Sequence, residues 1–143
     1  MADEKVLLVD DEKEFTHILS ERMKARGLTV VTAENGRSAL KKAKKEPYDA
    51  IILDMLMPEM DGIETMKHLL EINPDLQIII LTGHATLEKG VEAVKLGAMD
   101  FLEKPADIDK LMAKINKAKA QKMVLVEKRT EAKIKNILKT KGW

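Results

Sequence analysis

The chain has 143 residues, of which 45% are hydrophobic and 34% are charged, a balance typical of one folded domain and not of a disordered chain. It contains no cysteine, which excludes disulfides, thiolate metal sites and a cysteine nucleophile. No apolar stretch approaches the roughly 20 residues of a membrane-spanning helix, and the starting sequence MADEK is not that of a signal peptide, so we expect a cytoplasmic protein that does not contact a membrane.

The net charge of +1 conceals an uneven distribution along the chain. Residues 107–143 contain 11 basic and 4 acidic residues, whereas residues 1–106 contain 14 basic and 20 acidic residues. A basic tail behind an acidic body can bind nucleic acid or an acidic partner. The more frequent explanation is a lysine-rich helix that solvent surrounds.

Short apolar runs predict β-strands at regular intervals. The five predicted strands are Lys5–Asp10, Leu28–Ala33, Asp49–Asp54, Leu76–Thr82 and Ala98–Glu103. Their continuous apolar centres, such as VLLV, AIIL and IIIL, are typical of strands that are buried on both faces of a parallel sheet.

Amphipathic helical patterns separate these strands. They cover 15–23, 39–43, 63–70 and 87–94, and a fifth begins at Ile108. Asn35 is a suitable N-cap for the second pattern. The alternation predicts an α/β fold, a (βα)5 doubly wound parallel sheet. Because crossover connections are right-handed, few topologies remain, and we expect the flavodoxin-like strand order 2-1-3-4-5.

The fifth helical pattern continues beyond the last element that such a sheet needs. Residues 119–143 contain no proline and no glycine before Gly142, so they can extend the helix. Met123, Val126, Ile134 and Ile137 form a narrow apolar seam that is too short to predict a coiled coil. We therefore expect one domain at 1–118 and a basic helical extension at 119–143.

Chemically reactive side chains stand where the predicted strands end. These are Asp10-Asp11 after the first strand, Asp54 after the third, Thr82 after the fourth, and Lys104 with Pro105 after the fifth. The carboxyl ends of parallel strands meet at one edge of the sheet, so these groups converge there. Clustered carboxylates without His or Cys favour a hard cation such as Mg²⁺. A carboxylate nucleophile, a divalent cation and a lysine are the parts of a phosphoryl-transfer site.

The chain resembles the receiver domain of response regulators in two-component signalling, from about Lys5 to Ala118. The matching segments are LVDDEKEF at 8–15, ENG at 34–36, YDAIILDMLMPEMDG at 48–62, IIILTGHA at 78–85 and LGAMDFLEKP at 96–105. Five motifs in order, each one βα unit apart, make the resemblance specific. The segments LTGHAT and FLEKPAD are most similar to receivers of the nitrogen-regulation class.

This resemblance implies a role for the acidic residues. Asp54 would be the phosphoacceptor, which takes a phosphoryl group from a phosphohistidine of a histidine kinase or phosphotransfer protein. Asp11 would bind Mg²⁺ directly and Asp10 directly or through water. Asp54 and the backbone carbonyl of Leu56 would complete the protein ligands.

It also implies roles for the groups around the phosphate. Lys104 would pair with the phosphoryl oxygens, and the hydroxyl of Thr82 would turn toward them. The backbone N–H groups of Met55 and Gly83 would help to hold the phosphate. The peptide bond between Lys104 and Pro105 would be cis.

A conformational switch is implied as well. In the family, movement of Thr82 leaves a space that an aromatic residue, here Phe101, rotates to fill, although a plain core phenylalanine is the alternative. The face made by the fourth helix, fifth strand and fifth helix would then bind a downstream protein. Leu56 and His84 occupy the two positions that tune the dephosphorylation rate in this family.

Several outputs remain open from the sequence. The chain is either a stand-alone receiver that acts through protein contacts, including a phosphorylation-dependent homodimer, or the receiver of a larger transcriptional regulator or hybrid kinase. A small nucleic-acid binder is a third reading, which the absence of an aromatic before Trp143 in the tail disfavours. An aspartyl phosphatase would need an acid two residues after Asp54, where Leu56 stands, so we expect no separate enzymatic activity.

Overall fold

A computed structural model of the chain describes residues 4–140, and it contains one five-stranded parallel sheet with strand order β2-β1-β3-β4-β5. The strands are β1 (Lys5–Val9), β2 (Thr29–Ala33), β3 (Ala50–Asp54), β4 (Ile78–Thr82) and β5 (Asp100–Glu103). The helices are α1 (Lys13–Ala25), α2 (Gly36–Lys45), α3 (Gly62–Ile72), a short 3-10 turn η1 (His84–Thr86), α4 (Leu87–Lys95) and α5 (Ile108–Thr140). The predicted fold class and strand order are confirmed, and the observed strands are up to two residues shorter at their ends than predicted.

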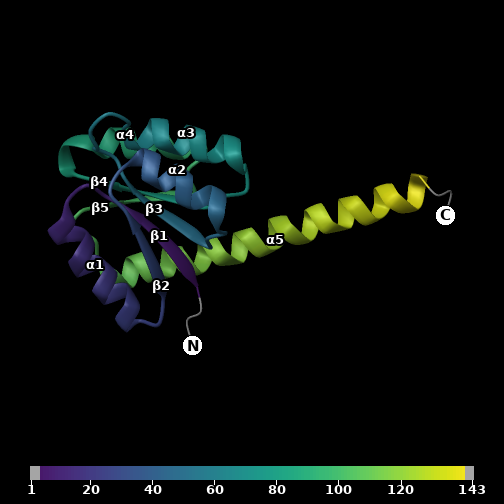
Figure 1. Cartoon of the computed structure of the whole chain (residues 1–143), viewed down its shortest axis with the longest axis horizontal. Helices are drawn as coiled ribbons and strands as arrows, with labels where there is room; N and C mark the ends of the chain where they lie inside the picture. Colours follow the sequence, from purple (N-terminus) through teal and green to yellow (C-terminus); the bar gives the residue numbers. More distant parts are fainter. Residues whose placement is uncertain (1–3, 141–143) are drawn as a thin grey trace.

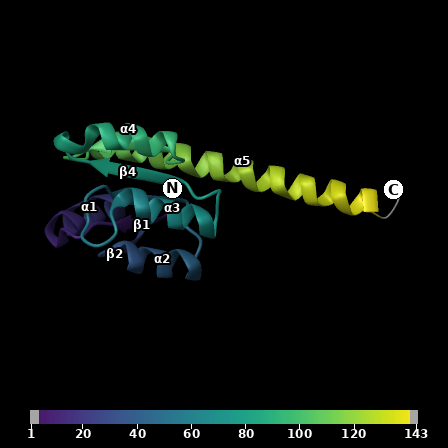
Figure 2. The same ribbon diagram turned by 90° about the horizontal axis from the view of Figure 1, so that it is seen from above.

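The helices cover the two faces of the sheet, as Figure 1 and Figure 2 show. Helices α2, α3 and α4 pack on one face through residues such as Ala39, Met66 and Ala93. Helices α1 and α5 pack on the other face, where Met23 and Ile115 are fully buried. Both faces of every central strand are therefore apolar, which explains the continuous hydrophobic runs in the sequence.

Local signals set the helix ends. The side chain of Asn35 accepts a hydrogen bond from the N–H of Ser38 at 2.8 Å and so caps α2, as predicted. Gly97 follows α4 with a φ of +126°, a conformation that side-chain-bearing residues rarely adopt. These short, well-terminated connections bring each strand back to the same edge of the sheet.

Helix α5 runs without interruption from Ile108 to Thr140 and extends far beyond the body of the domain (Figure 1). Leu111, Ile115 and Ala118 are buried against the sheet. Side chains 126–139 are all exposed. Within the described part of the chain, no helix is both long and apolar enough to cross a membrane.

The contact between α5 and the body does not end at the predicted boundary after residue 118. Lys119 lies 3.9 Å from a carboxylate oxygen of Glu4, and Lys122 donates a hydrogen bond to the backbone carbonyl of Tyr48 at 3.1 Å. Arg129 forms an ion pair with Asp75 and also donates to it at 3.1 Å. Basic residues of the helix thus bind acidic and carbonyl groups at the edge of the sheet opposite to the carboxyl ends of the strands.

These contacts predict where the chain can be shortened. A chain that ends after Ala118 should lose about 1–2 kcal/mol of unfolding free energy, because surface ion pairs contribute up to about 1 kcal/mol each. A chain that ends after Thr130 keeps all three contacts and should match the full chain. Urea unfolding followed by circular dichroism measures both. Equal stability of the two shortened chains would contradict a structural role for 119–129.

Candidate functional site

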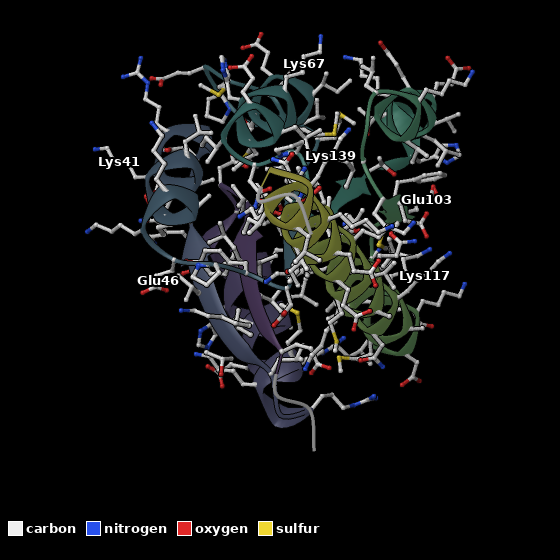
Figure 3. The ribbon with its side chains drawn as sticks, turned by 90° about the vertical axis from the view of Figure 1, so that its right-hand side faces the viewer. Lys41, Glu46, Lys67, Glu103, Lys117 and Lys139 are labelled. Atoms are coloured by element: carbon white, nitrogen blue, oxygen red, sulfur yellow. The ribbon has the colours of Figure 1, made fainter. Side chains whose placement is uncertain are left out.

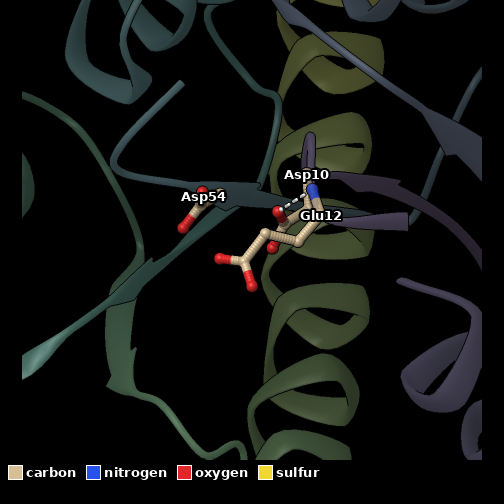
Figure 4. Close-up of side chains that lie close together, drawn as sticks. All are labelled: Asp10, Glu12 and Asp54. Atoms are coloured by element: carbon tan, nitrogen blue, oxygen red, sulfur yellow. Dashed lines mark hydrogen bonds between the residues drawn. The ribbon is translucent and has the colours of Figure 1, made fainter. Parts of the chain in front are cut away.

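Two buried carboxylates stand side by side at the carboxyl edge of the sheet. Asp54 is the last residue of β3, and Asp10 directly follows β1, the neighbouring strand. Only 2% of Asp10 and 5% of Asp54 are exposed. Asp10 Oδ1 accepts a hydrogen bond from the N–H of Glu12 at 2.9 Å, which turns the chain over the strand end. Carboxylate oxygens of Asp10, Glu12 and Asp54 lie within 4.8 Å of one another (Figure 4).

Lys104 brings a positive charge to this cluster from the end of β5. Its Nζ lies 2.9 Å from Asp10 Oδ2, 3.1 Å from Asp54 Oδ1 and 3.3 Å from Glu12 Oε1. The same ammonium lies 4.3 Å from the centre of the Phe15 ring. Its backbone N–H donates to the carbonyl of Thr82 at 2.7 Å, and the Lys104–Pro105 peptide bond is cis.

The burial of this cluster determines its electrostatics. Burial, followed by the charge of Asp10, raises the pKa of Asp54 from 3.8 to about 6 despite the opposing effect of Lys104. Burial also raises the pKa of Asp10. For Lys104, burial lowers the pKa, but hydrogen bonds and the charges of the two aspartates outweigh it, so its pKa is raised and the ammonium stays charged.

The donor set fits a hard divalent cation. Three carboxylates meet one ammonium, so negative charge is in excess, and all the clustered ligand atoms are oxygens. Asp11, expected as a direct ligand, is exposed and lies outside this cluster, although its charge contributes to the raised pKa of Asp54. The third carboxylate of the cluster belongs to Glu12, which was not among the residues predicted from the sequence. The signal was the third acid of DDE, which an aspartate turn brings above the strand end.

Thr82 ends β4, between the strands that carry Asp54 and Lys104. It is fully buried, and its Oγ1 has no hydrogen-bond partner among residues 4–140. The N–H of Gly83 donates to the hydroxyl of Thr86 at 3.0 Å. The N–H of Met55 donates to the carbonyl of Leu81 at 2.9 Å, so the predicted contact of this group with phosphate conflicts with the pairing of β3 and β4.

The remaining predicted residues surround this edge. Phe101 is partly buried on β5 and packs on the core face shared with α4. The side chain of Leu56 is 57% exposed. His84 is also exposed, and its Nδ1 lies 3.3 Å from Glu103 Oε1. His84 does not belong to the cluster of Asp10, Glu12 and Asp54.

A model of the response regulator receiver domain matches residues 6–116. The chain belongs to the response-regulator receiver family. Its order of strands is that of a two-component receiver domain, as the sequence predicts.

Individual relatives and solved structures are also similar to this chain. The transcriptional regulatory protein ZraR of Escherichia coli strain K12 is 39% identical over 115 residues, which are 80% of this chain and 26% of ZraR. A crystal structure of adenylate cyclase from Rhodopirellula baltica is 33% identical with a TM-score of 0.85, covering 92% of this chain and 98% of that one. The receiver domain of NtrX from Brucella abortus is 27% identical with a TM-score of 0.77, covering 80% and 98%.

These similarities have two consequences. The relation to ZraR and NtrX supports the nitrogen-regulation class that the sequence motifs indicate. The chain spans about a quarter of the length of ZraR, with 26% of that protein covered. The similarity therefore concerns only the receiver part of ZraR and does not extend to the activity of the remaining three quarters of that protein.

The raised pKa of Asp54 predicts how stability depends on pH. The folded state holds a proton on Asp54 up to pH about 6 and the unfolded chain only up to about 3.8, so Asp54 lowers stability as pH rises between these values. Without divalent cations at pH 7.5, Asp54→Asn should raise the unfolding free energy by about 3 kcal/mol, because the shift from 3.8 to about 6 corresponds to about 1.4 kcal/mol for each pKa unit. At pH 4 the difference should vanish.

Urea unfolding at the two pH values measures this effect, with the exposed Glu88→Gln as the control for loss of a carboxylate. If Asp54→Asn stabilised the protein equally at both pH values, the Asp54 charge would not be the cause.

Proposed function

We propose that this receiver is cytoplasmic and accepts a phosphoryl group on Asp54 from a phosphohistidine of a histidine kinase or phosphotransfer protein. The observation that carries the proposal is the contact of one buried carboxylate with Lys104 at the carboxyl edge of the sheet, 3.1 Å apart. Membership of the receiver family supports the same reaction.

The residues of the site suit each part of that transfer. With a pKa of about 6, Asp54 is mostly ionised at neutral pH and can attack phosphorus. The new bond joins a carboxylate oxygen to phosphorus, and the bond from phosphorus to the histidine nitrogen breaks. Lys104 lies where it can pair with the phosphoryl oxygens, and it keeps its charge because its pKa is raised.

We propose that Mg²⁺ binds beside Asp54, held by Asp10, Asp11, Asp54 and the backbone carbonyl of Leu56, as the family resemblance implies. Glu12 is a further carboxylate at the same place. When bound, the cation would offset the charge of the carboxylates and of the phosphoryl oxygens. Asp10 would mainly position the cation, because the N–H of Glu12 already holds the buried Asp10 carboxylate in place.

The switch that we propose uses Thr82 and Phe101. The unpaired hydroxyl of Thr82 gains a partner if it turns toward a phosphoryl group on Asp54. Gly83 can offer its N–H if Thr86 releases it. His84 and Leu56 would influence how fast water reaches the acyl phosphate, and we propose no reaction beyond transfer and this hydrolysis.

The output that we propose is a change in protein contacts on the face of α4, β5 and α5. Glu103 on β5 and Lys117 on α5 line one groove of this face, and Figure 3 shows both on the same side of the body. Leu87, Val91 and Val94 lie exposed on α4. The partner is a downstream effector or a second copy of the chain. The exposed apolar residues Met123, Ile134 and Ile137 of α5 favour the second copy.

Phosphorylation is tested directly with acetyl phosphate and Mg²⁺, followed by intact-protein mass spectrometry. We expect one added phosphoryl group, and none in Asp54→Asn or after chelation of the metal. Lys104→Met should slow the reaction on the order of 100-fold, the usual effect of losing one group that stabilises an oxyanion. Lys110→Met, an exposed lysine on α5, is the matched control. Full phosphorylation of Asp54→Asn would reject the proposed acceptor.

Self-association is tested by light scattering of the protein with Mg²⁺, with and without beryllofluoride as a phosphoryl mimic. We expect the mass to double when the mimic binds, and Asp54→Asn to stay unchanged. Replacing Ile134 and Ile137 by Ser should abolish the doubling if α5 forms the contact. A constant mass in wild-type protein that binds the mimic would assign the output to a different protein.

A further inference from the structure

Helix α4 has an internal glycine, and the two predicted switch residues, Thr82 and Phe101, occupy the space that a larger residue at that position would need. Gly90 is buried within Leu87–Lys95. A Cβ atom at this position would lie 2.7 Å from Cγ2 of Thr82 and 3.1 Å from Cδ2 of Phe101. Non-bonded carbon atoms pack at about 3.5–4.0 Å, so a side chain at position 90 requires Thr82 or Phe101 to move.

Glycine is otherwise a poor choice for this position. It is among the least favourable residues in the interior of a helix, because it loses the most backbone freedom on folding. Gly90 lies three residues after the start of α4 and five before its end, so neither cap explains it. The close packing of the helix on Thr82 and Phe101 does explain it.

The conformation of Thr82 makes this packing relevant to the switch. Its methyl group points toward α4, while its buried hydroxyl has no partner in the described part of the chain. Oγ1 and Cγ2 share one Cβ, so they move together when χ1 rotates. A rotation that gives the hydroxyl a new partner therefore also moves the methyl group away from its present place against Gly90.

Phe101 meets the same point of α4 from the neighbouring strand. Its backbone position on β5 pairs with Ile80 of β4, two residues before Thr82. Atoms Cδ2 and Cγ of the ring lie 3.1 and 3.2 Å from where a Cβ of residue 90 would be. One position of α4 is thus in contact with both residues whose rearrangement we propose to follow phosphorylation.

We propose that Gly90 is a positioning residue of this switch, which keeps the receiver in its resting arrangement by leaving room for the Thr82 methyl group and the Phe101 ring. This inference rests on the proposed function, because the resting arrangement is the one that precedes phosphorylation of Asp54. A methyl group at position 90 displaces Thr82 from its resting rotamer. It therefore favours the arrangement in which the hydroxyl turns toward the phosphoryl group.

The test is the affinity for beryllofluoride in the presence of Mg²⁺, measured by titration calorimetry. Gly90→Ala should bind the mimic about threefold or more tightly than the wild type, because the resting state that competes with binding is less populated. Lys89→Ala, an exposed neighbour on the same helix, should bind as the wild type does. Unchanged or weaker binding by a folded Gly90→Ala variant would overturn the inference.

The contact itself is tested by a double substitution. Thr82→Ser keeps the hydroxyl and removes the methyl group that lies 2.7 Å from the position of the added Cβ. On the Thr82→Ser background, Gly90→Ala should lose most of its effect on affinity. The same gain on both backgrounds would show that Gly90 does not act through Thr82.

A measurement on the wild-type protein does not depend on whether Gly90→Ala folds. Nuclear Overhauser effects from the Hα atoms of Gly90 to the Thr82 methyl group and the Phe101 ring should be strong without the mimic and weaken when it binds. Unchanged effects would overturn the inference while the proposed function stands. Failure of the wild type to bind the mimic, or equal binding by Asp54→Asn, would instead contradict the proposed function.

Discussion

The structure depends on one arrangement, the ion pair that Lys104 forms with two buried aspartates from other strands. Lys104 follows β5, whereas Asp10 and Asp54 stand at β1 and β3, with β4 in between. Two neighbouring carboxylates without water around them repel each other, and each would favour its protonated form. The ammonium of Lys104 lowers the cost of burying both carboxylates, because it forms an ion pair with each of them. The remaining excess of negative charge makes the same place attractive to a cation, and burial together with the charge of Asp10 raises the pKa of Asp54.

Much of this arrangement could be predicted from the sequence because parallel strands end at a common edge. Asp10, Asp54, Thr82 and Lys104 are each placed by the strand that precedes them, and the periodicity of the sequence locates those strands to within two residues. Loop geometry lies beyond that reasoning. Whether Asp11 or Glu12 faces the cluster depends on a hydrogen bond from a backbone N–H to Asp10.

Other features were hidden because they join residues far apart in the chain. The N–H of Met55 donates to the carbonyl of Leu81 because β3 pairs with β4. The residues at which the strands end do not by themselves specify this hydrogen bond. The ion pair of Arg129 with Asp75 spans 54 positions, and composition alone shows only that the tail is basic and the body acidic. The uneven charge, which by itself suggests an external partner, is thus partly used for contacts between the basic tail and the acidic body of the same molecule.

The first turns of α5 pack in the hydrophobic core, and its last turns project from the body as part of the same continuous helix. The direction in which each side chain of the last turns points is therefore fixed relative to the sheet. Each residue of an α-helix adds about 1.5 Å of length and 100° of rotation. A partner bound on the outer turns would therefore face a direction that is determined at Leu111 and Ile115, in the hydrophobic interior. Insertion of a single residue between the body and these turns would point the same apolar side chains to a different side of the molecule.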